Sequence, residues 1–220
     1  PEPLSKPLNP RTGPSSRSNK FQSHLRSFHH VLSDTPHSFA VAHSASLTLF
    51  SSETLSPAAT ISSSNAVTCA SFCSDARLLA ASDLLGLVQV FGVKSPTALR
   101  SLKSHSRHVR FVHFPRLDKL HLISTGDDAL VKLWDVAEVT PVSEFLDHND
   151  YVRCEDSSLV NSEIFVTGSY DYVVKLWDSR VRDLKSLVQV NHGASVEDVV
   201  FLPSGGMVAR LVGIRLSCET

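Results

Sequence analysis

The chain has 220 residues, of which 42% are hydrophobic, and a chain of this size and composition can bury a core. Its formal net charge is −1 at pH 7, so bulk electrostatics favours neither a nucleic-acid-binding protein nor a membrane-binding one. No run of 18 apolar residues occurs, and we therefore expect no membrane-spanning helix.

Residues 1–30 contain five basic residues and one acidic residue, together with many prolines and serines, and they lack apolar periodicity. Segments of this composition cannot bury enough apolar surface to fold. We predict a disordered, basic lead-in over 1–30. A second interpretation, a basic arm that contacts RNA or an acidic protein, stays open.

Alternating apolar and polar residues from residue 39 onward predict short strands with one buried face. The first two groups of strands are expected at Phe39–Ala42 and Leu47–Phe50, and then between Val67 and Leu102. The third group is expected at Val109–Phe114, Leu120–Thr125, Leu130–Asp135 and Val142–Phe145. The fourth is expected at Val152–Cys154, Glu163–Gly168, Val173–Asp178 and Lys185–Val190.

The four cysteines of the chain, Cys69, Cys73, Cys154 and Cys218, form no Cys-x-x-Cys pair. Cys69 and Cys73 have the even spacing of strand residues that face a core. We expect buried thiols in a reducing, intracellular protein, with no metal ion and no cofactor.

Two segments of the chain, Asp128–Asp135 and Asp171–Asp178, are nearly identical and lie 43 residues apart. Each ends in Trp-Asp. A repeat of about 40–45 residues with this ending resembles the blade of a WD40 β-propeller. The resemblance implies an all-β propeller of about four blades plus the start of a fifth. We place the blades at residues 31–62, 63–104, 105–147 and 148–191, the partial fifth at 192–208, and an aberrant tail at 209–220.

Two clear blades share a set of four residues. The sets are His105, Ser124, Asp128 and Trp134, and then His148, Thr167, Asp171 and Trp177. The WD40 resemblance implies a hydrogen-bond chain from Trp through Ser or Thr and His to Asp. A buried indole N–H needs an acceptor, which such a chain provides.

Ser124, His105 and Asp128 also have the residue types of a catalytic triad. Because the set recurs in the next blade with Thr167, we favour a structural role and predict no catalytic residues. The second blade lacks the expected His and has Phe91 where the third and fourth blades have Trp. We expect it to depend on packing instead.

Residues that follow the blade histidine are candidates for partner binding. The 43-residue shift aligns Arg110 with Arg153 and places Tyr151 beside Arg153, while Arg107 lies in the same segment as Arg110. Arginine and tyrosine are common at interaction hot spots. The alternative, solvated loop charge, stays open.

A different candidate is the Trp-Asp-x-Arg pattern that ends at Arg180. It resembles the motif by which some WD40 proteins dock on the adaptor of cullin-4 ubiquitin ligases. A substrate receptor of such a ligase is therefore the alternative function.

A closer resemblance is carried by segments on both sides of the second Trp-Asp, namely His148–Cys154, Phe165–Asp178 and Phe201–Gly206. These segments resemble the U3 small nucleolar RNA-associated protein 15 family, as do Ala66–Leu79, Ser124–Asp135 and, in plant members, Phe39–Pro57. The resemblance covers about residues 38–208.

This resemblance implies a non-enzymatic scaffold in the nucleolus of the nucleus. Members belong to the small-subunit processome, support 18S ribosomal RNA maturation and, in some organisms, ribosomal DNA transcription. The implied partners are protein subunits of that assembly. Contacts with the backbone of pre-ribosomal RNA or U3 RNA would use basic residues such as Lys103, Arg107 and Arg110. No membrane or small-molecule substrate is implied.

The chain departs from the family pattern in two places. After Met207 it runs to Thr220 without another Trp-Asp, and we expect this form to lack the helical C-terminal domain that the resemblance implies. Glu155 and Asp156 stand where a strand is usually apolar. From the first departure we expect an open arc of blades that is marginally stable or dependent on a partner.

Overall fold

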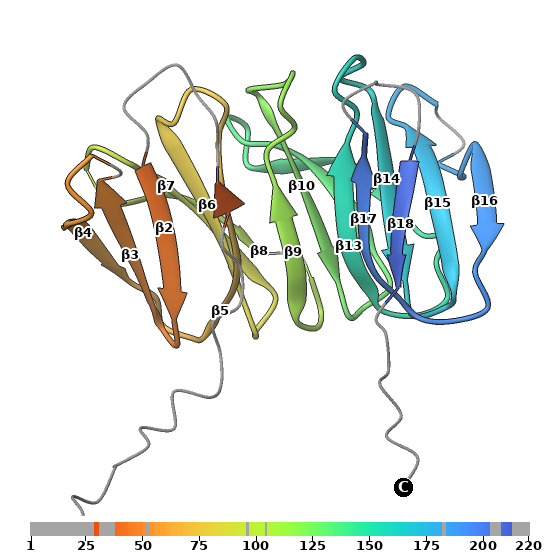
Figure 1. Cartoon of the computed structure of the whole chain (residues 1–220), viewed down its shortest axis with the longest axis horizontal. Coiled ribbons are helices and arrows are strands. Elements are labelled where there is room, and N and C mark those ends of the chain that lie inside the picture. Colours follow the sequence, from red (N-terminus) through yellow and green to blue (C-terminus); the bar gives the residue numbers. More distant parts are fainter. Residues whose placement is uncertain are drawn as a thin grey trace, which may run out of the picture.

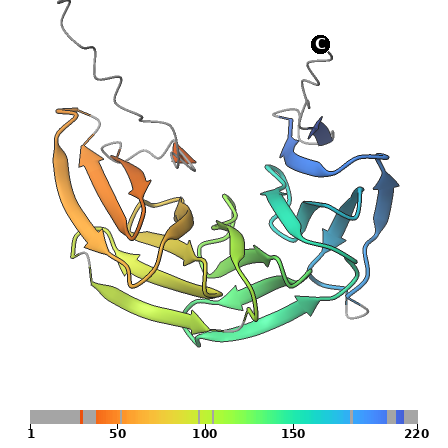
Figure 2. The ribbon, with the colours of Figure 1, turned by 90° about the horizontal axis from the view of Figure 1, so that it is seen from below.

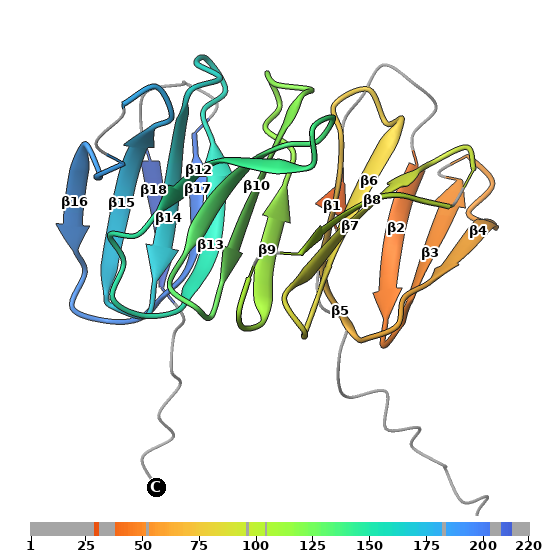
Figure 3. The same ribbon diagram turned by 180° about the vertical axis from the view of Figure 1, so that it is seen from behind.

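The computed structural model describes residues 29–30, 38–51, 53–95, 97–103, 105–181, 184–202 and 208–212. These residues form four four-stranded sheets and one two-stranded sheet, all antiparallel. The four-stranded sheets stand side by side in chain order, and the two-stranded sheet lies against the last of them (Figure 1 and, from behind, Figure 3). Seen along the other axis, they follow an open arc whose first and last sheets do not meet (Figure 2). The prediction of an all-β, WD40-type propeller arrangement in an open arc is confirmed.

Each four-stranded sheet is a meander of consecutive strands, here called a blade. Blade 1 consists of β1 (His29–His30), β2 (Ser38–His43), β3 (Ser46–Ser51) and β4 (Pro57–Ser62). Blade 2 consists of β5 (Val67–Phe72), β6 (Leu78–Asp83), β7 (Leu87–Gly92) and β8 (Ala98–Lys103).

The next two blades follow the same order. Blade 3 consists of β9 (Val109–His113), β10 (His121–Gly126), β11 (Val131–Asp135) and β12 (Thr140–Phe145). Blade 4 consists of β13 (Val152–Ser157), β14 (Ile164–Ser169), β15 (Val173–Asp178) and β16 (Val188–Asn191). The two-stranded sheet pairs β17 (Val196–Phe201) with β18 (Val208–Val212).

The core consists of four hydrophobic clusters, each of which lies between two neighbouring sheets. The middle strands of blades 2 to 4 are buried on both faces because neighbours cover both, whereas the outer strands β8 and β16 are mostly exposed. Trp134 and Trp177 are almost completely buried in this core. Burial of apolar surface between the sheets is therefore the main force that holds the blades in order.

Two predicted boundaries differ from the structure. His29 and His30, placed in the lead-in, form β1 and pair with β2. The tail predicted from residue 209 begins inside β18, which pairs with β17. Both segments form strands because antiparallel pairing needs only a free strand edge and a compatible pattern. The rest of the predicted lead-in, residues 1–28, and of the tail, residues 213–220, lies outside the described residues.

The two acids that looked misplaced in a strand, Glu155 and Asp156, join blades together. The Glu155 carboxylate is fully buried and lies 2.9 Å from Nδ1 of His113 in blade 3. Its other oxygen accepts a hydrogen bond from Ser157. Asp156 accepts a hydrogen bond from the backbone N–H of Phe201 in β17. Blade 4 is thus tied to both of its neighbours through polar groups.

Among the residues that the structure describes, no helix is long and apolar enough to cross a membrane.

Candidate interaction surface at the inner strand bulges

In blade 3, the four residues of the predicted set form one continuous chain of hydrogen bonds. Trp134 Nε1 donates to Ser124 Oγ at 2.8 Å, and Ser124 Oγ lies 2.8 Å from His105 Nε2. His105 Nδ1 lies 2.9 Å from Asp128 Oδ1. Burial raises the pKa of Asp128, but His105 and the backbone N–H groups of Ser106 and Leu130 together outweigh burial and lower it.

In blade 4, the second set repeats this geometry with Thr in place of Ser. Trp177 Nε1 donates to Thr167 Oγ1 at 2.8 Å, and Thr167 Oγ1 lies 2.7 Å from His148 Nε2. His148 Nδ1 lies 2.8 Å from Asp171. Although burial raises the pKa of Asp171, the hydrogen bonds with His148 and two backbone N–H groups lower it to about 2.

The hydroxyl in each set bonds to a buried Trp and a buried His, and both histidine rings are fully buried. A catalytic hydroxyl has to reach a substrate, whereas these two lie inside the protein with no exposed surface. The arrangement therefore supports a structural role for both sets.

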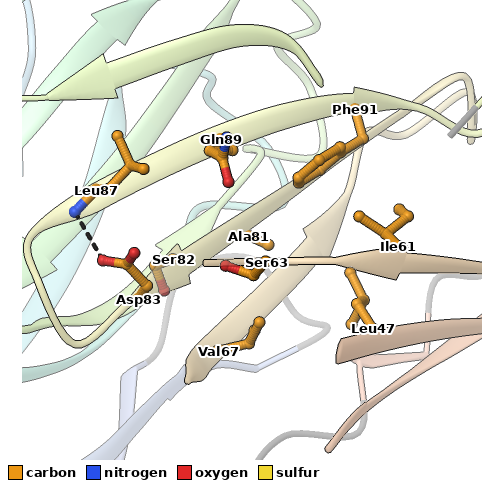
Figure 4. A pocket seen from close by; sticks show the side chains of 10 residues that line it. All are labelled: Leu47, Ile61, Ser63, Val67, Ala81, Ser82, Asp83, Leu87, Gln89 and Phe91. Atoms are coloured by element: carbon orange, nitrogen blue, oxygen red, sulfur yellow. Dashed lines mark hydrogen bonds between the residues drawn. The ribbon is translucent and has the colours of Figure 1, made fainter. Parts of the chain in front are cut away.

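Blade 2 fills the same region with apolar residues, as its sequence predicts. Figure 4 shows Phe91 beside Ile61 and Leu47 of blade 1, with Ala81 at the place of Ser124. One carboxylate still closes the turn, since Asp83 accepts the backbone N–H of Leu87 at 3.0 Å. Packing thus replaces the hydrogen-bond chain in this blade.

The inner strands β5, β9, β13 and β17 line the concave side of the arc (Figure 2) and carry a common irregularity. The pairing of each with its neighbour skips one residue near the start of the strand. A β-bulge of this kind re-aims the side chain of the extra residue. The four residues at these bulges are Thr68, Arg110, Arg153 and Glu197.

These bulge residues line one hollow of about 460 Å³, together with Tyr170 and Asp198. The 43-residue shift identifies Arg110 and Arg153 as equivalent. It misses Thr68 and Glu197, because the matching spacings are 42 and 44 residues. The 44-residue step from His148 to His192 is a signal that could have located Glu197.

Arg110 is held by an acid of its own blade. Its Nε lies 2.8 Å from Asp127 Oδ1 and its Nη2 lies 2.6 Å from Asp127 Oδ2. These hydrogen bonds raise the pKa of Arg110. The side chain is 17% exposed, so the pair is accessible only from one side.

Arg153 is held by aromatic rings. Its guanidinium carbon lies 4.4 Å from the centre of the Tyr170 ring and 5.9 Å from that of Tyr151. Its Nη2 donates to the Tyr170 hydroxyl at 3.1 Å, and that hydroxyl donates to Glu197 at 2.6 Å. Burial first, and then the hydrogen bond to Glu197, raise the pKa of Tyr170.

The two arginine sites are joined. Arg153 Nη1 lies 3.8 Å from Asp127, so one polar network runs from blade 3 through blade 4 to Glu197 in β17. The buried Nε of Arg153 has no hydrogen-bond partner in the described structure. The network thus brings two guanidinium groups and two tyrosine rings together on the concave side, while the Nε of Arg153 stays buried. Such groups suit contacts with the polar surface of a partner.

The remaining predicted partner-binding residues lie apart from this network. Arg107 is exposed, and the described residues offer it no ion pair or side-chain hydrogen bond. Arg180 is 63% exposed, but its Nε and Nη2 donate to Asp178 at 2.9 and 2.6 Å. The guanidinium group of Arg180 is therefore already bonded to a carboxylate of its own turn.

The part of the chain that the structure describes contains no group of three or more His, Cys, Asp or Glu side chains arranged to hold a metal ion. Cys69, Cys73 and Cys154 are buried thiols that form no disulfide bond among the described residues.

Two segments of the chain, residues 96–135 and 139–178, match the family model "WD domain, G-beta repeat". Each match starts with the outer strand of one blade and ends with the third strand of the next. A sequence repeat therefore bridges two sheets, and this covalent link adds to the packing between them.

Named relatives are similar over most of this chain. Protein SLOW WALKER 1 of Arabidopsis thaliana is 49% identical over 178 residues, which are 81% of this chain and 34% of the relative. U3 small nucleolar RNA-associated protein 15 homolog of Xenopus laevis is 36% identical over 179 residues, with the same two coverages. U3 small nucleolar RNA-associated protein 15 of Saccharomyces cerevisiae is 34% identical over 75% of this chain and 33% of the relative. The chain thus spans about a third of the length of these relatives.

Proposed function

Since this chain belongs to the U3 small nucleolar RNA-associated protein 15 family, we propose that it serves ribosome biogenesis as a non-enzymatic WD40 scaffold of the small-subunit processome. The proposal includes a nucleolar location, contacts with protein subunits of that assembly, and a contribution to the maturation of 18S ribosomal RNA. The proposal extends to a role in ribosomal DNA transcription.

The observation that carries this proposal is the similarity of 34–36% to proteins whose names tie them to U3 small nucleolar RNA. The blade geometry agrees with it, because both Ser/Thr-His-Asp sets are buried against a Trp and support a scaffold rather than an enzyme. The ligase-receptor alternative gains no support, since Arg180 is engaged by Asp178 and the relatives above carry no ligase name.

Recovery of RNA with the tagged chain tests the proposal directly. The full chain would be expressed in Arabidopsis cells and purified, and U3 RNA would be compared with an unrelated small nucleolar RNA by quantitative PCR. We expect selective enrichment of U3 RNA, together with nucleolar fluorescence of the tagged chain. Equal recovery of both RNAs from a soluble, folded chain would contradict the proposal.

Within this function, we assign partner contact to the bulge network around Arg110 and Arg153. Arg110→Ala alone is an ambiguous test, because it leaves Asp127 without its bidentate partner. The double variant Arg110→Ala/Asp127→Ala removes both charges and avoids an unpaired buried acid. It is expected to fold but to recover less of the assembly.

Arg107→Glu separates RNA contact from protein contact, since this exposed residue lacks a described partner within the chain. If Arg107 touches a phosphate, its reversal should weaken recovery of RNA and flatten its dependence on salt. Unchanged recovery with both variants would show that the partners bind elsewhere.

A further inference from the structure

An apolar groove opens between blades 2 and 3, at the end of the sheets opposite the two histidine sets. Its volume is about 230 Å³. Blade 2 contributes Leu78, Val90, Leu99 and Arg100, and blade 3 contributes Lys119, Leu120, Val136 and Ala137. Leu99 is 45% exposed and Leu120 is 65% exposed. Two leucines thus stand at the rim with much of their apolar surface in water, which is a property of interaction sites.

The repeat supplies an internal comparison for this groove. Val136 N–H donates to the carbonyl of Leu120, and Ser179 N–H donates to the carbonyl of Glu163 in blade 4. Leu120 and Glu163 therefore occupy the same place in successive blades.

At the matched place between blades 3 and 4, an acid replaces Leu120 and is bonded by neighbouring hydroxyls. Glu163 accepts hydrogen bonds from the hydroxyls of Ser162 and Ser179. The positions of Leu99 and Arg100 are occupied there by Val142 and Ser143. The blade architecture thus does not require an apolar residue at the place of Leu120, and the pair of exposed leucines is found between blades 2 and 3 but not at the matched place between blades 3 and 4.

The charges at the rim indicate what kind of partner fits. Arg100 and Lys119 are exposed cations, and none of the eight lining residues is acidic. Asp118, next to Lys119, is engaged by His121 at 2.6 Å and by two backbone N–H groups. Glu138 follows Ala137 in the chain but is not among the residues that line the groove. An apolar floor with cations on its rim is complementary to aliphatic side chains flanked by carboxylates.

We propose that this groove binds a short acidic segment of a partner protein, whose aliphatic side chains insert between Leu99 and Leu120 while its carboxylates face Arg100 and Lys119. The basic N-terminal residues of the chain itself have the wrong charge for this place. Single-stranded RNA has the right charge, but its bases bind by stacking on aromatic rings, and the lining has none. This surface is distinct from the bulge network and does not depend on the proposed function.

Peptide display on the purified full chain tests the groove. A random twelve-residue phage library would be selected on the wild type and counter-selected on Leu120→Glu, which copies Glu163 of the next blade. We expect the enriched peptides to be acidic and to carry aliphatic residues. Circular dichroism would check that both proteins are folded.

An enriched peptide would then be measured by fluorescence anisotropy. Leu120→Glu and Lys119→Glu should each weaken binding by about tenfold or more, because apolar burial and charge pairing are removed in turn. Val142→Ser, at the place matched to Leu99, should leave binding within about twofold. Several results would overturn the inference: no groove-dependent peptides, basic or purely polar peptides, equal weakening by Val142→Ser, or oligouridylate binding that Leu120→Glu abolishes.

Discussion

Removal of the His113 imidazole tests the polar contact that joins blades 3 and 4. In the wild type, the fully buried Glu155 carboxylate lies 2.9 Å from His113 Nδ1. His113→Ala leaves that carboxylate buried with only Ser157 as a described side-chain partner. The loss of one partner from a buried ion pair costs about 3–5 kcal/mol.

The structure points to the lower end of this range. Ser157 still donates to Glu155, and the His113 side chain is 15% exposed, so water can reach the vacated space. We expect a loss of about 3 kcal/mol in the free energy of unfolding. For a chain of this length, that corresponds to a fall of about 6–12 °C in the melting temperature.

The effect should depend on pH in one direction. Burial lowers the pKa of His113, but the charge of Glu155 and the hydrogen bond to it outweigh burial and raise the pKa. Protonation of His113 therefore favours the folded state. This stabilisation is fully present below the ordinary histidine pKa of about 6.5 and is lost as the pH rises through the raised pKa of the folded state.

Urea unfolding of wild type and His113→Ala between about pH 5.5 and 8.5 provides the measurement. The difference between them should be largest at the acidic end and shrink as the pH rises. His121→Ala is the matched control, because its partner Asp118 lies near the surface and such pairs contribute about 0.2–1 kcal/mol. A loss below about 1 kcal/mol at acidic pH, or a difference that grows with pH, would refute the reasoning.

Three further predictions concern the blades. Ser124→Ala leaves a buried indole N–H without its acceptor and should cost about 1–3 kcal/mol in urea unfolding, whereas a loss near zero would argue against the hydrogen-bond chain. The folded state lowers the pKa of Asp171 from 3.8 to about 2. The ionised Asp171 therefore stabilises the fold above about pH 3.8, and this stabilisation is lost as the pH falls through the folded-state pKa. Asp171→Asn should remove this part of the acid transition. Gly86 has a φ of 85°, and a Cβ there would lie within 3 Å of two backbone oxygens, one of them in His105. Gly86→Ala should therefore cost more than the 1–2 kcal/mol of left-handed strain alone, while Ala129→Gly in the matched turn should not destabilise; equal melting of both variants would contradict this.

Much of the architecture could be predicted from the sequence because its signals are local and repeated. Alternating apolar residues located the strands of blades 3 and 4 within a few residues of their observed bounds, and for blade 2 they gave the overall span. The repeated Trp-Asp gave the period, and the period placed His105, Ser124, Asp128 and Trp134 in one set that the structure brings together. Such agreement is expected when one unit is specified several times in one chain.

Other features could not be read from spacing. A bulge adds one residue to one strand without a marker in the sequence, so Thr68 and Glu197 fell out of register with the two arginines. The partners of those arginines, Asp127 and Tyr170, also differ between the two blades. Equivalent positions therefore do not guarantee equivalent contacts.

The sequence by itself determined the strands, the blade period and the residues that bind each buried Trp, because strand alternation and a repeated motif depend on neighbours within one unit. Only the tertiary structure decided how successive blades meet. It paired Glu155 with His113, gathered the bulge residues on the concave side and left Leu99 and Leu120 facing an open groove. These contacts join residues that are distant in the chain, and their geometry follows from the packing of whole sheets.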